Sequence, residues 1–237
     1  MIPRVIHYCW FGKNPMPRLS RRCIDSWRRF MPDWEIREWN DRNFNLNLNA
    51  YIKHAYSAGK YAFVSDYARF WVLYHHGGVY FDTDVMLVKS FDELVAHGSF
   101  MGFEKNNDVL AVNPGLGMGA PCGVEFYGEM INLYDNHEVN PNDISPIEPI
   151  MIKYTTAKLL ERGLILEDKQ QCVAGINIYP NNYFNPLNDY DGRLNITPDT
   201  YSIHYYAKSW ISGYGSLRSW LTRRYHRVLK AKKDSHV

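Results

Sequence analysis

Two carboxylates stand one residue apart in Asp82-Thr83-Asp84, directly after the apolar run Val79–Phe81. Carboxylate oxygens at this spacing can bind one hard cation, Mn²⁺ or Mg²⁺, which keeps further positions for water and substrate phosphates. The same spacing also occurs in solvated turns, so the motif alone leaves both interpretations open. A strand that ends at these acids favours the metal site, because α/β folds bind ligands at the carboxyl edge of their sheet.

A second pair, Asp66 and Arg69, stands three residues apart in a predicted helix, away from its apolar stripe. This spacing is typical of an i,i+3 ion pair that stabilises a helix by a few tenths of a kcal/mol. Alternatively, the carboxylate could bind sugar or ribose hydroxyls while the guanidinium binds a phosphate. Taken alone, the pair is explained most simply as the helical ion pair.

Trp10 and His204 are single residues with two interpretations each. Trp10 ends the apolar run Val5–Trp10, where it could belong to the core or stack on a nucleotide base. His204 lies in the run Tyr201–Tyr206, where it could be structural or supply a nitrogen ligand to a carboxylate-bound Mn²⁺. The residues alone do not choose between these alternatives.

Alternating strands and helices must position these candidates. The early segments predict strand, helix, strand and helix over Val5–Trp10, Arg18–Phe30, Trp34–Trp39 and Asn49–Ala58. An aromatic stripe of helical period predicts a helix over Tyr61–His75, and a Gly77-Gly78 turn leads from it into strands Val79–Phe81 and Val85–Val88. Further along we expect helices at Phe91–His97, Gly123–Tyr134, Glu148–Arg162 and Leu217–Lys233, strands at Phe100–Glu104 and Tyr201–Tyr206, and irregular structure over 175–200. This order indicates an α/β fold.

Composition excludes several classes of protein. The 237 residues are 46% hydrophobic and 22% charged, which argues against disorder and against a small disulfide scaffold. Residues 218–233 hold seven Lys or Arg and no acid, so the rest of the chain carries 20 − 25 = −5 and no nucleic-acid partner is expected. Four scattered cysteines, no apolar run of membrane-spanning length and no secretion signal lead us to expect a cytoplasmic protein.

Three segments in order resemble the DXD-containing sugar transferases of glycosyltransferase family 32. They are IPRVIHYCWFG at 2–12, SDYARFWVLYHHGGVYFDTDV at 65–85 and IHYYAKSW at 203–210. The chain looks most like bacterial members from capsule, exopolysaccharide or lipopolysaccharide biosynthesis. The resemblance implies a GT-A fold, a Rossmann-like nucleotide-sugar domain with a mixed central sheet. We expect one catalytic domain over 1–216, with a nucleotide-sugar half (1–104) and an acceptor half (105–216), followed by a basic C-terminal helix within 217–237.

The resemblance also implies roles for particular residues. Asp82 and Asp84 resemble the carboxylates that hold the cation and the donor diphosphate, and Trp10 resembles the base-stacking aromatic. Asp66 resembles the acid that bonds sugar or ribose hydroxyls of the donor, and Arg69 resembles the neighbouring basic contact to the donor. The remaining expectations are Tyr80 beside the site, His204 as a further metal ligand, and Ser209 and Trp210 closing over the diphosphate. Glu148, at a predicted helix start, could lie on the acceptor side or could instead stabilise the helix N-terminus through its charge.

The function implied is a metal-dependent retaining glycosyltransferase. It would move a hexose or N-acetylhexosamine from a nucleotide-sugar to a surface polysaccharide or a lipid-linked oligosaccharide. A UDP-sugar is the first expected donor, and GDP-mannose is the alternative.

Two other functions remain open. A nucleotidyltransferase would need a Gly-rich basic loop, of which residues 11–18 (FGKNPMPR) supply only a poor version, and a sugar-binding module would not bind a nucleoside diphosphate. The basic segment 217–233 is either a solvated helix or a peripheral contact with the inner face of the plasma membrane.

Overall fold

The computed structural model describes residues 1–106, 109–137, 150–189 and 191–207. Within these residues, eight strands form one sheet in the order β2-β1-β3-β7-β5-β9-β8, with β6 paired to β5. Their bounds are β1 Val5–Cys9, β2 Glu35–Trp39, β3 Gly78–Tyr80, β5 Phe100–Asn106, β6 Val109–Val112, β7 Met118–Ala120, β8 Gln171–Val173 and β9 Ile176–Tyr179. Strands β4 (Val85–Leu87) and β10 (Ser202–His204) form a separate antiparallel pair.

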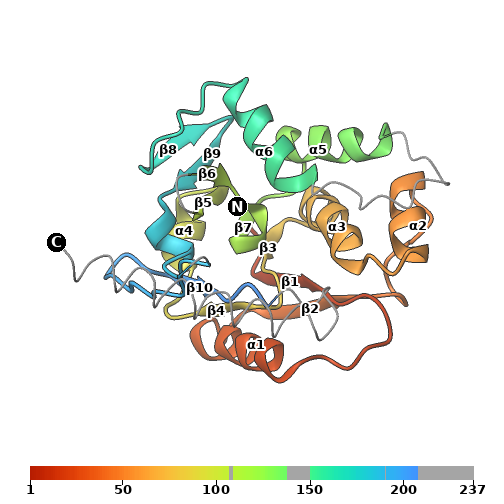
Figure 1. Cartoon of the computed structure of the whole chain (residues 1–237), viewed down its shortest axis with the longest axis horizontal. Helices are drawn as coiled ribbons and strands as arrows, with labels where there is room; N and C mark the ends of the chain where they lie inside the picture. Colours follow the sequence, from red (N-terminus) through yellow and green to blue (C-terminus); the bar gives the residue numbers. More distant parts are fainter. Residues whose placement is uncertain (107–108, 138–149, 190, 208–237) are drawn as a thin grey trace.

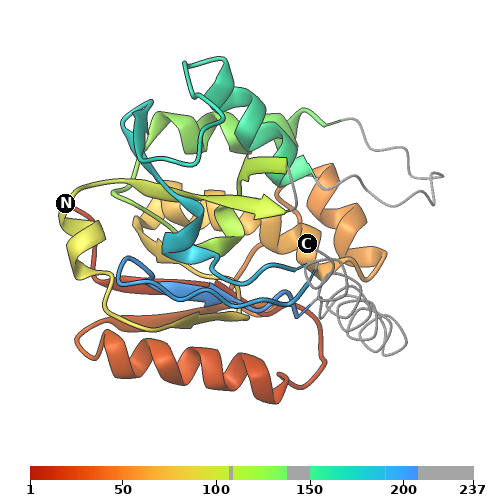
Figure 2. The ribbon, with the colours of Figure 1, turned by 60° about the vertical axis from the view of Figure 1, so that its left-hand side comes forward.

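Helices cover both faces of the large sheet (Figures 1 and 2). The helix α1 (Arg18–Phe30) lies on one face, and α2 (Ala50–Ser57), α3 (Tyr61–His76), α5 (Glu125–Asp135) and α6 (Ile150–Leu160) lie on the other. Two shorter helices, α4 (Asp92–Ala96) and α7 (Asn181–Phe184), and a 3₁₀ turn, Pro114–Leu116, complete the described elements.

The sheet is mixed. Strands β2, β1 and β3 run parallel, β7 runs antiparallel to both of its neighbours, and β9 pairs parallel with β5. The predicted α/β class with a mixed central sheet is therefore confirmed. One sheet draws strands from both predicted halves of the chain, whereas the domain boundaries themselves stay a prediction.

The helices α1 and α3 form where the sequence predicts them. Cys23, Ile24 and Trp27 are buried along one face of α1, and the helix stops before Met31-Pro32, where proline cannot continue it. The indole Nε1 of Trp27 donates to the carbonyl of Val85 at 2.7 Å and so ties α1 to β4.

The turn between α3 and β3 requires glycine. Gly77 ends the helix with φ +64°, and Gly78 follows with φ +106°. A Cβ on Gly78 would lie 2.6 Å from the carbonyl oxygen of Val5, closer than side chains tolerate. The chain can therefore reverse tightly and bring the next strand alongside β1.

His7 lies fully buried in β1 and holds this turn in place. Its Nδ1 accepts a hydrogen bond from Trp39 Nε1 (3.1 Å), so its Nε2–H donates to the carbonyl of Gly77 (2.9 Å). Burial lowers the pKa of His7 from 6.5 to about 4, and the charges of Arg37 and His76 add to this, against the Gly77 hydrogen bond. His7 is therefore a neutral structural residue.

This burial predicts an acid-dependent loss of stability. Between about pH 6.5 and pH 4 the unfolded chain binds a proton at His7 that the folded chain refuses, so stability falls as pH falls. Across this pH range the unfolding free energy should fall by about 3 kcal/mol because of His7. Denaturant unfolding of wild type and of His7→Gln at pH 7.5, 6.0 and 4.5 gives the unfolding free energy of each protein as a function of pH. The contribution of His7 is the difference between the two slopes. As a control, His97→Gln at an exposed position should keep the wild-type slope. A wild-type slope in His7→Gln would contradict the interpretation that His7 is buried as a neutral imidazole.

Several predicted features differ from the structure or lie outside it. The region 175–200, predicted to be irregular, contains β9 and α7, and the sequence does not predict β6, β7 or β8. Among the described residues, no helix combines the length and apolar character needed to cross a bilayer. The predicted basic helix Leu217–Lys233 and Glu148, Ser209 and Trp210 lie outside the described residues.

Candidate functional site

Two parallel strands bring Trp10 and the Asp82-Thr83-Asp84 motif to one edge of the sheet. In the register of β1 and β3, His7 stands beside Tyr80, so the chain leaves both strands at the same end. Trp10 follows His7 by three residues, and Asp82 follows Tyr80 by two. This carboxyl edge is the place where α/β folds bind ligands.

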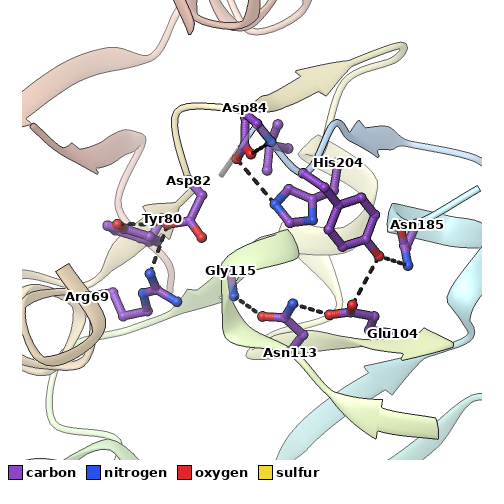
Figure 3. A network of polar contacts seen from close by, with 12 residues as sticks. Arg69, Tyr80, Asp82, Asp84, Glu104, Asn113, Gly115, Asn185 and His204 are labelled. Carbon is purple, nitrogen blue, oxygen red and sulfur yellow. Dashed lines mark hydrogen bonds and ion pairs between the residues drawn. The ribbon is translucent and has the colours of Figure 1, made fainter. Parts of the chain in front are cut away.

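A second strand pairing brings His204 to the same place. Strands β4 and β10 are antiparallel with Val85 opposite His204, which places Asp84 next to the imidazole. The Nε2 of His204 lies 3.2 Å from Asp84 Oδ1, while Asp84 Oδ2 accepts from the backbone N–H of Ala207 at 2.7 Å. Figure 3 shows Asp82, Asp84 and His204 gathered at one point, and one ligand atom from each lies within 4.8 Å of the others.

Asp84 and His204 form an ion pair. Burial alone would raise the pKa of Asp84, but the charge of His204 and the hydrogen bonds from His204 and Ala207 lower it. Burial alone would lower the pKa of His204, but the charge and hydrogen bond of Asp84 raise it to about 9. Asp84 therefore carries its negative charge at neutral pH, ready to bind a cation.

The Asp66–Arg69 ion pair is present, but it lies inside the protein rather than on a helix surface. Arg69 is 2% exposed and Asp66 is 9% exposed. The Nη2 of Arg69 contacts Asp66 Oδ1 at 3.0 Å and Asp82 Oδ1 at 2.9 Å, so one guanidinium bridges the helix and the metal-binding motif. Tyr80 donates its hydroxyl to Asp82 Oδ1 at 3.1 Å, and its ring lies 5.1 Å from the guanidinium carbon.

Burial shapes the charges of this cluster. It raises the pKa of Asp66 to about 6, against the lowering effect of Arg69, and it also raises the pKa of Asp82, against Arg69 and His204. Burial opposes the charge on Arg69, but Asp82, Tyr80 and Asp66 outweigh it and raise its pKa. Arg69 is thus the cation that opposes the effect of burial and favours the ionised form of both carboxylates.

Trp10 is half-buried rather than part of the closed core. Its indole Nε1 donates to the carbonyl of Asn14 at 2.9 Å, and its backbone N–H donates to the carbonyl of Trp39 at 2.8 Å. The ring is thus held in one orientation at the edge where β1 ends. This position suits a stacking surface, and the role stays a prediction.

The sequence does not single out a set of polar residues that lies beside the motif. These residues are Glu104, Asn113, Gly115, Asn185 and Tyr206, which come from four separate segments and join through hydrogen bonds (Figure 3). A carboxylate that ends the apolar strand Phe100–Glu104 is the one local signal that could have drawn attention to the set.

The donor set fits a hard divalent cation. Oxygens of Asp82 and Asp84 and a nitrogen of His204 lie within 4.8 Å of one another, close to the roughly 3.0–4.2 Å that separates octahedral ligands with bonds of about 2.1 Å. His204 could bind the cation only after releasing the proton that it shares with Asp84 in the ion pair, so cation binding at this site would displace a proton. Among the described residues, the cluster also includes Asp66 and Glu104, so four carboxyl side chains stand with two basic ones, Arg69 and His204, and this excess of acids favours a bound cation. The Nδ1 of His204 is buried without a hydrogen-bond partner within the described residues.

Comparisons with known proteins cover the segment that contains Asp66, Arg69 and the Asp82-Thr83-Asp84 motif. Residues 17–101 match the family model described as the glycosyltransferase sugar-binding region containing DXD motif. The chain is 32% identical over 111 residues to inositol phosphoceramide mannosyltransferase 1 of Schizosaccharomyces pombe, which covers 42% of this chain and 33% of the yeast protein. It is 25% identical over 224 residues to uncharacterized glycosyltransferase L373 of Acanthamoeba polyphaga mimivirus. That match covers 89% of this chain and 84% of the viral protein.

Among solved structures, the PaToxG glycosyltransferase is similar with a TM-score of 0.47 and 18% identity, over 68% of this chain and 69% of that one. The chain spans about a third of the length of the yeast mannosyltransferase that it matches. The predicted resemblance to DXD-containing sugar transferases is confirmed by the family match and the two relatives. A bacterial origin stays a prediction.

Proposed function

We propose that this chain, whose residues 17–101 match the DXD-containing sugar-binding region of glycosyltransferases, is a metal-dependent retaining hexosyltransferase. The observation that carries the proposal is the convergence of Asp82, Asp84 and His204 from two strand pairs at the carboxyl edge of the sheet. The proposed reaction moves a hexose, or an N-acetylhexosamine, from a nucleoside diphosphate to a glycan or lipid-linked hydroxyl.

The proposed chemistry breaks the bond between the sugar C1 and the diphosphate oxygen and forms one from C1 to the acceptor oxygen. When bound, a divalent cation neutralises the charge that develops on the leaving diphosphate. Asp82, Asp84 and His204 would hold the cation. Arg69 fixes the Asp82 carboxylate from behind, and Asp66 is the group proposed to accept hydrogen bonds from donor hydroxyls.

Retention of configuration follows if the acceptor attacks the face that the diphosphate leaves. The departing phosphate oxygen then receives the acceptor proton, so no protein base is required. The main catalytic contribution of the protein would then be electrostatic stabilisation of the leaving diphosphate.

Two donors stand as predictions. A UDP-sugar is the donor expected from the sequence, whereas similarity to a protein named as a mannosyltransferase supports GDP-mannose. A surface polysaccharide or lipid-linked oligosaccharide as the acceptor, and a cytoplasmic site of action with peripheral membrane contact through 217–233, are parts of the same proposal.

A nucleotide panel tests the proposal directly. Calorimetry with UDP, GDP, CDP and their common sugars, each with Mn²⁺ and with EDTA, should show Mn²⁺-dependent binding of one nucleotide family. The base that binds identifies the donor class, and hydrolysis of the matching nucleotide-sugar should depend on the same cation. Failure of every nucleotide to bind would contradict the proposal and favour a sugar-binding protein.

Trp10→Ala tests the base-stacking role. Stacking of one base on an aromatic ring contributes about 1–3 kcal/mol, so nucleotide affinity should fall roughly 5- to 150-fold. Trp10→Phe keeps an aromatic face and should retain most of the affinity, although it loses the hydrogen bond to Asn14. Calorimetry with the nucleotide identified by the panel provides the measurement. If Trp10→Ala binds the nucleotide as tightly as wild type does, Trp10 serves packing and does not stack on the base.

A further inference from the structure

A buried chain of hydrogen bonds crosses from β5 to the segment after β10, next to the cation site (Figure 3). Glu104 on β5 is its centre. One carboxylate oxygen accepts from the hydroxyl of Tyr206 at 3.1 Å, and the other accepts from Asn113 Nδ2. Asn185 Nδ2 donates to the Tyr206 hydroxyl at 2.6 Å. We call Glu104, Asn113, Asn185 and Tyr206 the Glu104 network.

Most polar side-chain atoms of the network have hydrogen-bond partners, although Asn185 Oδ1 is buried without one among the described residues. Both oxygens of Glu104 have partners, and Asn113 Oδ1 accepts from the backbone N–H of Gly115 at 2.7 Å. Glu104, Asn113 and Tyr206 are 8%, 4% and 9% exposed. Side chains so buried and so occupied are suited to fixing the positions of other groups rather than to contacting a substrate.

One end of the network reaches Asp82. Gly115, whose N–H is held by Asn113, accepts a backbone hydrogen bond from Asp82 at 3.4 Å through its own carbonyl. The position of the Asp82 backbone is therefore linked to the Asn113 side chain.

The other end reaches His204 and Asp84. The ring of Tyr206 packs against the imidazole of His204, with centroids 4.4 Å apart. The next residue, Ala207, donates its N–H to Asp84 Oδ2 at 2.7 Å. Fixing Tyr206 thus fixes both the side chain that packs on His204 and the backbone that holds Asp84.

We propose that Glu104 and Tyr206 are positioning residues that set the spacing of Asp82, Asp84 and His204 and thereby the affinity of the cation site. This inference rests on the proposed function, because it concerns the cation that the transferase requires. Neither residue belongs to the set of Asp82, Asp84 and His204 that would hold the cation. They act through His204 on β10 and through Asp82 and Asp84 of the motif between β3 and β4, two parts of the chain that are distant in sequence.

Tyr206→Phe is the first test. It removes one hydroxyl, so Glu104 Oε1 loses a donor and Asn185 Nδ2 loses an acceptor, while the ring that packs on His204 remains. Loss of a partner that orients metal ligands weakens metal binding by roughly 10- to 100-fold. Titration calorimetry of the full chain with Mn²⁺ should therefore show about tenfold weaker binding.

Tyr205→Phe is the matched control. Tyr205 is the adjacent residue, and its hydroxyl contacts Met86 Sδ at 3.7 Å rather than the Glu104 network. It should bind Mn²⁺ as wild type does. Thermal unfolding of both variants separates positioning from stability, since a merely structural role would lower Tm without changing Mn²⁺ affinity in the folded protein.

A polarity exchange tests Glu104. In Glu104→Gln, whichever way the new amide turns, either Asn113 Nδ2 or the Tyr206 hydroxyl loses its acceptor. In Asn113→Asp, two carboxylates face each other. The double variant E104Q/N113D restores a donor opposite an acceptor while Gly115 and Tyr206 keep their bonds. Mn²⁺ affinity should fall about tenfold in each single variant and recover in the double.

The outcomes separate this inference from the proposed function. Wild-type Mn²⁺ affinity in both Tyr206→Phe and Glu104→Gln, with loss of binding in Asp84→Asn, would overturn the positioning role and leave the transferase proposal standing. Failure of wild type to bind Mn²⁺, alone or with UDP or GDP, would overturn the cation site and the positioning role with it.

Discussion

Asp84→Asn is expected to lower turnover by about 10²–10³-fold or more, because electrostatic stabilisation of the leaving group is the largest catalytic contribution that a site of this kind supplies. The substitution removes a carboxylate charge that the structure keeps ionised through His204 and the N–H of Ala207. The asparagine oxygen can still accept from Ala207, so the backbone around the site should stay in place.

The measurement is turnover of the nucleotide-sugar identified by the panel, across a range of Mn²⁺ concentrations. The variant should need more Mn²⁺ than wild type to reach its residual rate, since it has lost a cation ligand. Thermal unfolding should show a folded protein. Asp33→Asn, at an exposed position, removes the same charge elsewhere and should leave turnover unchanged. Activity like that of wild type in Asp84→Asn would contradict the metal-binding role of the motif.

The elements that the sequence predicts well are those with a local signal. The helix over Arg18–Phe30 has those bounds in the structure because its buried face and its Met31-Pro32 stop are both local. The predicted helix Tyr61–His75 ends one residue later, at the glycine turn. Periodicity and stop residues are properties of a short segment, and a single sequence displays them directly.

The central strand β7 shows why other elements could not be predicted. Met118-Gly119-Ala120 has three residues and no alternation of apolar and polar side chains. Gly119 is required because a Cβ there would lie 2.3 Å from the ring of Phe100 on the neighbouring strand. A glycine in so short a segment is locally typical of a loop, and only the tertiary contact with a distant aromatic ring makes it part of a strand.

The candidate site divides in the same way. The Asp82-Thr83-Asp84 spacing and the Asp66–Arg69 spacing are local, and the amino-acid sequence displays both directly. The pairing of β4 with β10 is not local, so the sequence can suggest His204 but cannot place it against Asp84. The bond from Tyr206 to Glu104 joins residues 102 positions apart. No spacing rule could connect them.

Arg69→Met is expected to destabilise the protein by about 3–5 kcal/mol, because it leaves Asp66 and Asp82 as buried carboxylates without their shared cation. Arg28→Met is a matched control, since Arg28 pairs with Asp25 at the same i,i+3 spacing on α1, but with both side chains more than half exposed. An exposed pair of this kind contributes roughly 0–1 kcal/mol. Urea unfolding of both variants at pH 8 compares the two pairs.

The pH dependence of the Arg69→Met deficit identifies its cause. In wild type, burial raises the pKa of Asp66 to about 6 while Arg69 lowers it, so removing Arg69 raises the pKa of Asp66 further. A carboxyl whose folded pKa is above its unfolded value binds more protons when folded, so stability falls as pH rises between the two values. In Arg69→Met this pH range extends to higher pH, so the variant should lose more stability relative to wild type at pH 8 than at pH 5.5. Adding Asp66→Asn, which removes one buried charge, should recover part of the loss at pH 8. A loss of stability no larger than that of Arg28→Met would contradict the stabilisation of these two buried carboxylates by Arg69.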